Sequence, residues 1–418
     1  MAEISRNENG RRIELTLLRN RNLWLALLVC IAVGKLFLTA VVPPSYDLRD
    51  IYFLATTQIT VVPWIFVESA MIGVWKAVAH PNSIPLGWYT TSPFSMPIET
   101  RFLLLLLRFP VFASDIACLA ILYRVVSVLW TAERARLASL LWFLNPYTFL
   151  AAESLAVPDI AVVFFTLLAF LLMVRGRAVF SSLALGIGVA LKLYPILLVP
   201  AFLAFALTDP RHTRWAKAAL VLLPLTGLGG YLAWAMPQGL SEGAMLNYDP
   251  VSQPMTALFS AIPGSRVSLV AIVLVILYYA TFKFAKGKQI PLNSLVSPIF
   301  LLTYTFSDPA PQYFLWVIPF LTIDVAFGGR ARRAGLTAML SFVLAVWFMV
   351  SAGFLTPSGY SFLLFPLQGR NLPEYSVAIT TFLNGSFAFL LTLVLQAALH
   401  STTLVYAIEV FRGWFTAH

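Results

Sequence analysis

Few charged side chains in this sequence could do chemistry, and two sets of them stand out. Asp47 and Asp50 follow Pro43 and Pro44 in VPPSYDLRD, whereas Lys192 interrupts the apolar run LALGIGVALKLYPILLVPAFLA. Carboxylates three residues apart share one helical face, where they could supply a general base or bind a divalent ion that carries a phosphate. An N-cap aspartate followed by a first-turn acid would have the same spacing, so both interpretations stay open.

Lys192 needs an explanation because a lysine inside a membrane-spanning segment costs about 3 kcal/mol on insertion scales. It lies at the predicted outer end of its span, and Tyr194 follows it closely. An ammonium group at this place would suit a lipid-linked phosphate, which lysine binds as a point charge. Snorkelling of the side chain to the interface is the alternative. The position on the acidic rather than the basic side of the membrane favours phosphate binding.

Further polar side chains lie at the outer ends of other apolar segments. Asp159 lies at the start of an apolar segment in AAESLAVPDIAVVFF. There it either interacts favourably with the N-terminal end of the helix dipole or lines an outward cavity together with Glu153. Asp308, Gln312 and Tyr313 fall in YTFSDPAPQYFLW. Polar groups mixed with aromatic rings are typical of sugar sites, although Ser-Asp-Pro is also common turn chemistry. Because all of these residues are predicted on the same side of the membrane, they indicate a binding site there.

Arg108 and Asp115 lie inside one apolar segment, RFPVFASDIACLAILYR. A separation of seven residues places them on the same face of a helix. Charged groups in such a segment pair with one another or share a polar cavity. We expect a structural ion pair between them.

The elements that must position these side chains are membrane helices. Of the 418 residues, 60% are hydrophobic and only 11% are charged, which excludes an ordinary soluble domain. The net charge of +10 comes from short basic clusters between apolar segments, so it indicates cytoplasmic loops and not nucleic-acid binding. Both cysteines lie within apolar segments, which argues against an exported disulfide, and the four histidines show no metal-ligand spacing.

Apolar stretches of membrane-spanning length predict an all-α polytopic protein with about twelve transmembrane helices. The predicted spans are 23–42, 102–125, 136–152, 158–174, 178–191, 194–208, 217–236, 266–285, 291–306, 311–328, 334–355 and 376–398. A cytoplasmic N-terminus then places every multiply basic loop inside. We expect one domain over 1–418, with a cytoplasmic tail at 1–22 and a long exoplasmic loop at 43–101 whose apolar runs form interfacial helices.

Several segments resemble the polyprenyl-phosphate-dependent mannosyltransferases of the GT-C superfamily, in order from about residue 44 to 320. LKLYPILLVPAFLA resembles the Lys-x-Tyr-Pro segment of this group, and PQYFLWVIPFL resembles its Pro-Gln-Tyr-aromatic segment. FLNPYTFLAAESLAVPDIAVVFFTLLAFLL is similar to its third and fourth spans, and RFPVFASDIACLAILYR to its second. The group includes the enzyme that adds the first mannose to glycosylphosphatidylinositol, with bacterial and archaeal relatives.

The resemblance implies a membrane glycosyltransferase, and most specifically a mannosyltransferase. It would move a sugar, with inversion, from a polyprenyl- or dolichyl-phosphate donor to a lipid-linked or glycan acceptor at the exoplasmic face. Asp47 or Asp50 would deprotonate the acceptor, and Mg²⁺ or Mn²⁺ could assist, although Asp-x-x-Asp replaces the Asp-x-Asp of eukaryotic relatives. Lys192 would contact the donor phosphate. The remaining residues expected to bind substrate are Tyr194, Glu153, Asp159, Asp308, Gln312 and Tyr313.

Two other classes of protein share this pattern. A non-catalytic relative of the same fold could serve as a scaffold subunit that binds a lipid, and an accessory membrane subunit would then be a partner. A lipid transporter is the second alternative, but it would be expected to have repeated halves and ionisable groups near the midplane. Each alternative keeps the chain in the plasma membrane of a prokaryote or the endoplasmic reticulum membrane of a eukaryote, among membrane lipids.

Overall fold

The computed structural model describes residues 20–41, 64–79, 97–154, 156–235, 269–285, 292–305, 311–326, 336–341, 343, 394–395 and 397–409. The regular structure in these ranges is helical throughout, and they contain no strand. The all-α prediction is confirmed for the described part of the chain.

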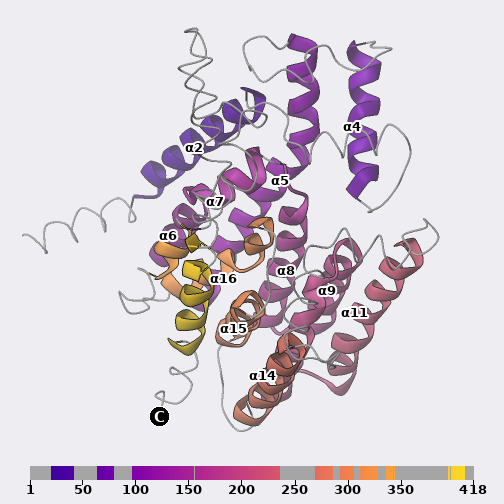
Figure 1. The fold of residues 1–418 in the computed structure, drawn as a ribbon, viewed down its shortest axis with the longest axis vertical. Helices are drawn as coiled ribbons and strands as arrows, with labels where there is room; N and C mark the ends of the chain where they lie inside the picture. The colour runs from indigo at the N-terminus through magenta and orange to yellow at the C-terminus, as the bar shows by residue number, and fades with distance from the viewer. Residues whose placement is uncertain are drawn as a thin grey trace, which may run out of the picture.

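The helices follow the predicted spans closely, and α9 has the predicted bounds (Figure 1). In chain order, the elements are α2 (Arg21–Val41), α4 (Trp64–Ala79), α5 (Ile98–Leu129), α6 (Ala132–Phe143), α7 (Pro146–Phe149), the π-helical turn η1 (Leu150–Ser154), α8 (Asp159–Val174), α9 (Ala178–Leu191), the 3₁₀ turn η2 (Tyr194–Leu198), α10 (Val199–Thr208), α11 (Arg214–Ala235), α14 (Leu269–Ala285), α15 (Leu292–Thr305), the 3₁₀ turn η4 (Pro311–Trp316) and α16 (Ile318–Ala326).

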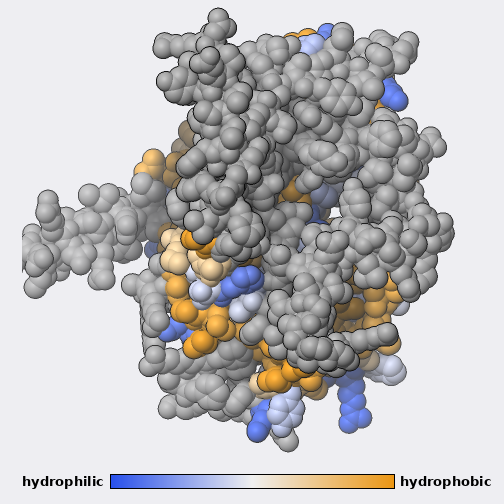
Figure 2. All heavy atoms as spheres, viewed as in Figure 1, coloured by the Kyte–Doolittle hydropathy of each residue, from blue (hydrophilic) through white to orange (hydrophobic). Residues whose placement is uncertain are grey.

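Two of the described helices, α5 and α11, are long and apolar enough to cross a membrane by themselves. With 32 residues, α5 extends over about 48 Å, more than the roughly 30 Å of a hydrocarbon core. Exposed hydrophobic side chains gather near α14 in Figure 2, with hydrophilic ones along the lower edge. The chain is a helical membrane protein. The count of twelve spans stays a prediction, and the spans at 334–355 and 376–398 lie largely outside the described residues.

The predicted exoplasmic segment 43–101 contains α4, which stands beside one end of α5 in Figure 1. Trp75 of α4 is buried, and its indole N–H donates to the carbonyl of Glu99 at 3.0 Å. With 16 residues, α4 is too short to span a bilayer unaided. Its placement at the membrane interface stays a prediction.

Close packing of α9 on α11 holds that pair of helices in place. A methyl group added at Gly227 would overlap the carbonyl oxygen of Gly186, and one added at Gly186 would lie 2.7 Å from the carbonyl oxygen of Leu223. The two backbones are therefore in direct contact, which only glycine permits at these positions.

Two neighbouring helices, α8 and α9, are shorter than the hydrocarbon core of a bilayer is thick. The 16 residues of α8 and the 14 of α9 extend over about 24 and 21 Å. Both are tied at one end by the short basic loop between Arg175 and Arg177. With this basic loop at the predicted cytoplasmic surface, the other ends would stop within the depth of the hydrocarbon core. Irregular backbone at that depth must be buried in protein or line a cavity, which makes these ends the place to search for a site.

Candidate functional site: two buried ion clusters

The first cluster surrounds Lys35 of α2, which is almost fully buried. Its Nζ lies 2.6 Å from Oδ2 of Asp115 in the middle of α5 and 3.0 Å from Oε1 of Glu153 in η1. The indole N–H of Trp142 donates to the other oxygen of Asp115 at 2.7 Å, and the ring of Phe143 lies 4.4 Å below the ammonium group. This Lys35 cluster joins four elements, α2, α5, α6 and η1.

Asp115 and Arg108 share one face of α5, as predicted, but both contact α2. Arg108 donates to the carbonyl of Thr39 at 2.7 Å, and Asp115 pairs with Lys35. Lys35 and Thr39 are one helical turn apart, so each lies opposite one of the α5 side chains. The expected Arg108–Asp115 pair does not occur among the described ion pairs, because α2 packs against this face and supplies a closer cation.

The second cluster surrounds Lys192, the residue that ends α9. Its backbone is extended, with φ −161°, which carries the side chain away from the helix. Nζ lies 2.9 and 3.0 Å from the two oxygens of Asp159, the first residue of α8. Trp316 of η4 donates its indole N–H to Asp159 at 2.7 Å, and the Tyr313 ring lies 4.3 Å from Nζ. Asp159 is buried, whereas 33% of the Lys192 side chain is exposed.

Aromatic rings fix the geometry of the Lys192 cluster. Tyr194 stacks on Trp316 with ring centroids 3.6 Å apart and an interplanar angle of 10°. The hydroxyl of Tyr304 donates to the carbonyl of Tyr313 at 2.6 Å. The indole that donates to Asp159 is therefore held between rings and cannot turn away without breaking this stack.

Strained backbone lies next to both clusters. Glu153 belongs to the π-helical turn η1, and Ala156 has φ +58°, a left-handed conformation that costs a non-glycine residue energy. Cys118, three residues beyond Asp115 on α5, places its Sγ 3.6 Å from the carbonyl of Ile160. The two clusters thus lie on either side of one irregular segment. Such π-turns and strained residues are frequent at functional sites.

The chemistry that these clusters can do is limited. Asp115 and Asp159 each accept hydrogen bonds from a lysine and a tryptophan. A general base must reach the proton it removes, but both carboxylates are buried and already paired. The described residues contain no group of three potential metal ligands, and the ammonium of Lys35 occupies the place between Asp115 and Glu153. Neither carboxylate cluster fits a divalent cation.

The predicted site residues fall into three sets. Lys192, Asp159, Tyr194 and Tyr313 meet in the second cluster, whereas Glu153 joins the first and is buried away from the surface. Gln312 belongs to η4, and its side chain lies outside the described part of the structure. The predicted catalytic pair and one predicted binding residue also lie outside the described residues: Asp47, Asp50 and Asp308.

Four residues of the clusters were not predicted from the sequence, namely Lys35, Trp142, Phe143 and Trp316. The signal for Lys35 was present, because it is a lone charge in the apolar run LWLALLVCIAVGKLFLTAVV, as Lys192 is in its own segment. Indole donors in apolar helices carry no such signal, because tryptophan is common in membrane segments.

One family model matches the chain, over residues 85–236, and it describes the GPI transamidase subunit PIG-U. The match covers 152 of the 418 residues. It runs from before α5 to the end of α11 and so includes Asp115, Glu153, Asp159 and Lys192. No curated protein and no solved structure matches the chain.

This match corrects the predicted function. The family is described as a subunit of GPI transamidase and not as a glycosyltransferase, so the prediction of a mannosyltransferase is wrong. The resemblance to GT-C enzymes rested on segments such as LKLYPILLVPAFLA, which supplies Lys192 and Tyr194 to the second cluster. The predicted bases, Asp47 and Asp50, lie outside the described residues. A sugar donor likewise has no support, whereas the alternative of a non-catalytic subunit fits the match.

Proposed function

We propose that the chain is a non-catalytic membrane subunit of the GPI transamidase type. It would assemble with other membrane subunits and hold a phosphate-bearing glycolipid beside Lys192 without turning it over. The family match over residues 85–236 supports the subunit class. The observation that carries the lipid-binding role is the position of Lys192, whose ammonium group is oriented by a buried carboxylate while 33% of its side chain is exposed.

The geometry around Lys192 suits a phosphate as an additional partner. An ammonium group has three donors, and the two oxygens of Asp159 engage two of them. The third can face a ligand. Because Asp159 neutralises the ammonium, the attraction for phosphate is weaker than that of a free lysine. Such a site would bind and release a lipid, as a holding subunit requires.

The burial of the Lys35 cluster also supports the non-catalytic role. Its ammonium and carboxylates are 0 to 5% exposed, so no lipid headgroup can reach them. Their contacts join α2, α5 and η1 and so stabilise the packing behind the Lys192 cluster. Of the two ion clusters, the first is thus structural and the second is one that a ligand can approach.

Titration of the full chain in nanodiscs with fluorescent glycosylphosphatidylinositol tests the binding role. Lys192→Met should weaken binding about tenfold or more, the usual scale for a lost charge-assisted hydrogen bond. Lys76→Met is the matched control, because Lys76 is an exposed lysine of α4 on the same predicted side. Equal binding by wild type and Lys192→Met would overturn the role of Lys192.

Affinity purification of the tagged full chain from its native membrane tests the subunit role separately. Other membrane proteins should be recovered in a fixed ratio and should survive the Lys192→Met change, because assembly does not depend on the ligand site. Recovery of the chain as a lone monomer under mild detergent would contradict the assignment to a complex.

A further inference from the structure

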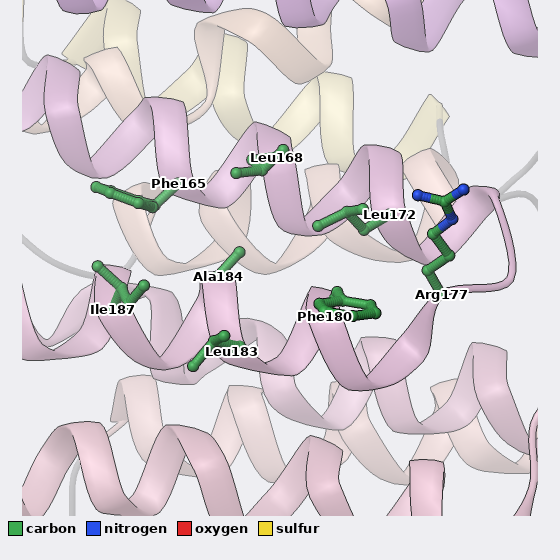
Figure 3. Close-up of a pocket in the computed structure, with 8 residues that line it drawn as sticks. All are labelled: Phe165, Leu168, Leu172, Arg177, Phe180, Leu183, Ala184 and Ile187. Atoms are coloured by element: carbon green, nitrogen blue, oxygen red, sulfur yellow. The ribbon is translucent and has the colours of Figure 1, made fainter.

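A shallow hollow lies between α8 and α9 (Figure 3), and none of its lining residues belongs to either ion cluster. Its volume is about 270 Å³. Phe165, Leu168 and Leu172 of α8 form one wall, and exposed side chains of α9 form the other, with Phe180 61% exposed. Ala184 on α9 is buried and too small to fill the space between the walls. The hollow is therefore an apolar groove that is open to the surroundings.

A single charged residue lines this groove. Arg177 directly precedes α9, is exposed, and extends its guanidinium across the end of the groove toward α8 in Figure 3. Arg175 is exposed on the same loop, and the side chain of Arg211 approaches Gly176 between them. Asp209 engages Arg211 through two nitrogens, so one carboxylate accompanies the three arginines of this region. This end of the groove attracts an anion.

The length of the groove matches one leaflet of a bilayer. Arg177 and Ile187 mark its two ends, and ten residues of helix rise about 15 Å. This is half of the roughly 30 Å hydrocarbon core. Because Arg177 lies in a basic loop that is predicted to be cytoplasmic, the groove runs from the headgroup level of that leaflet to the midplane. A lipid of the same leaflet has its phosphate and its chain at those two depths.

The charge at one end of the groove favours a lipid as its occupant, because Arg177 offers a partner to an anionic headgroup beside an apolar channel. An extended hydrocarbon chain is thin enough to lie between the two rows of side chains. Basic pockets between transmembrane helices on the cytoplasmic side are the usual setting for anionic headgroups.

We propose that the α8–α9 groove binds one acyl chain of an anionic glycerophospholipid of the cytoplasmic leaflet, with the lipid phosphate on Arg177. This site is distinct from the Lys192 cluster, because Asp159 and Lys192 lie at the opposite ends of the same two helices. The bound lipid would cover exposed side chains such as Leu183, which is 49% exposed.

Photolabelling of the full chain in nanodiscs tests this proposal. The probe is phosphatidylglycerol with a diazirine in one acyl chain, and diacylglycerol with the same chain is the uncharged comparison. Labelled peptides are mapped by mass spectrometry. The phospholipid should label the groove-lining residues of α8 and α9 with about tenfold preference over diacylglycerol, because only it offers a phosphate to the guanidinium. Equal labelling by the two lipids, or labelling spread evenly over all exposed helices, would overturn the site.

Matched variants separate the parts of the site. Arg177→Gln should reduce groove labelling about tenfold, whereas Arg175→Gln, on the same loop but outside the groove, should leave it nearly unchanged. Ile187→Trp should block the deep end, and Leu222→Trp places the same ring on an exposed face of α11 as its control. Equal losses from the two arginine variants would show general attraction by the loop and would contradict a specific site. Undiminished labelling of both Arg177→Gln and Ile187→Trp would also reject the proposal.

Discussion

The Lys35 and Lys192 clusters place the same kind of ion pair in two different surroundings. Lys35 is 5% exposed in its side chain, and its two carboxylates are fully buried. Lys192 is 33% exposed, and it pairs with one carboxylate beside an aromatic wall. A buried ion pair adds little net stability but is costly to break. The first arrangement therefore specifies how helices pack, whereas the second leaves a cation that can exchange partners.

The difference follows from where each lysine lies in its helix. Lys35 is inside α2, so the helix directs its side chain into the protein, where Asp115 of α5 and Glu153 of η1 enclose it. Lys192 caps the end of α9, where the chain turns away and leaves one side open. Lys192, which follows the end of a helix, is thus accessible, whereas Lys35, inside a helix, is buried.

Removal of the Lys35 cation should have the largest effect on stability. Lys35→Met leaves Asp115 and Glu153 buried without a cation, and loss of one partner of a buried pair costs about 3–5 kcal/mol. Thermal unfolding in detergent would measure the loss, with Lys283→Met as the control, since Lys283 is an exposed lysine of α14.

A second variant keeps this prediction testable if Lys35→Met fails to fold. Lys35→Met combined with Asp115→Asn should recover part of the loss, because the double change removes one of the unpaired charges. A double variant that is no more stable than Lys35→Met would contradict charge burial as the cause.

A disturbance of the contact between α9 and α11 should affect the two clusters differently. Gly227→Ala would place a methyl group against the Gly186 carbonyl, and overpacking of this kind costs about 1–3 kcal/mol. The shift of α9 should loosen the Lys192 cluster at its end and leave the Lys35 cluster, whose residues belong to α2, α5, α6 and η1, intact. Thermal unfolding and lipid titration would measure both effects.

Gly229 of the same helix provides the matched control, because nothing lies within 4 Å of a methyl group added there. Gly229→Ala should be neutral or slightly stabilising, since alanine favours a helix. Equal losses from the two alanine variants would show that helix propensity, and not the α9–α11 contact, determines the result.

Loss of the Lys192–Asp159 pair should cost less than loss of the Lys35 cation. Lys192→Met should lower the free energy of unfolding by about 1 kcal/mol, because 33% of the Lys192 side chain is already exposed and Trp316 still donates to Asp159. A double-mutant cycle with Asp159→Asn would measure the coupling, which we expect to be at least about 0.5 kcal/mol. A loss from Lys192→Met as large as that from Lys35→Met would erase the distinction between the clusters.

Much of the helix layout could be predicted from hydrophobicity alone. The bounds of α9 were predicted fully, because charged residues flank a clean apolar run. The span predicted at 136–152 divides into α6, α7 and η1 instead. This break could have been predicted from Asn145 and Pro146, because asparagine is a common N-cap and proline is common at the first helical position. In the structure, the Asn145 side chain accepts from the N–H of Tyr147, and Pro146 begins the new helix.

The partners within the site could not be predicted in the same way. The sequence marked Lys192 as unusual, but Asp159 is 33 residues away and Trp316 is on a different helical segment. Lys35 and Asp115 are 80 residues apart. Such pairs depend on how helices pack, and hydrophobic runs specify which faces are apolar but not which helices become neighbours.

The smallest effect should come from acidic pH, acting far from both clusters. His212 lies in the loop between α10 and α11, with Asp209, Arg211 and Lys217 around it. Burial lowers its pKa below the usual 6.5, and the attraction of Asp209 only partly offsets this effect. Between the lowered pKa and 6.5, the unfolded chain binds more protons than the folded chain, so stability falls as the pH drops below about 6.5. Asp209 has a lowered pKa and stays charged in this window. His212→Gln should therefore weaken the pH dependence of the free energy of unfolding between pH 6.5 and 5. Thermal unfolding in detergent at several pH values would measure this dependence. An unchanged slope would assign the pH response to other groups.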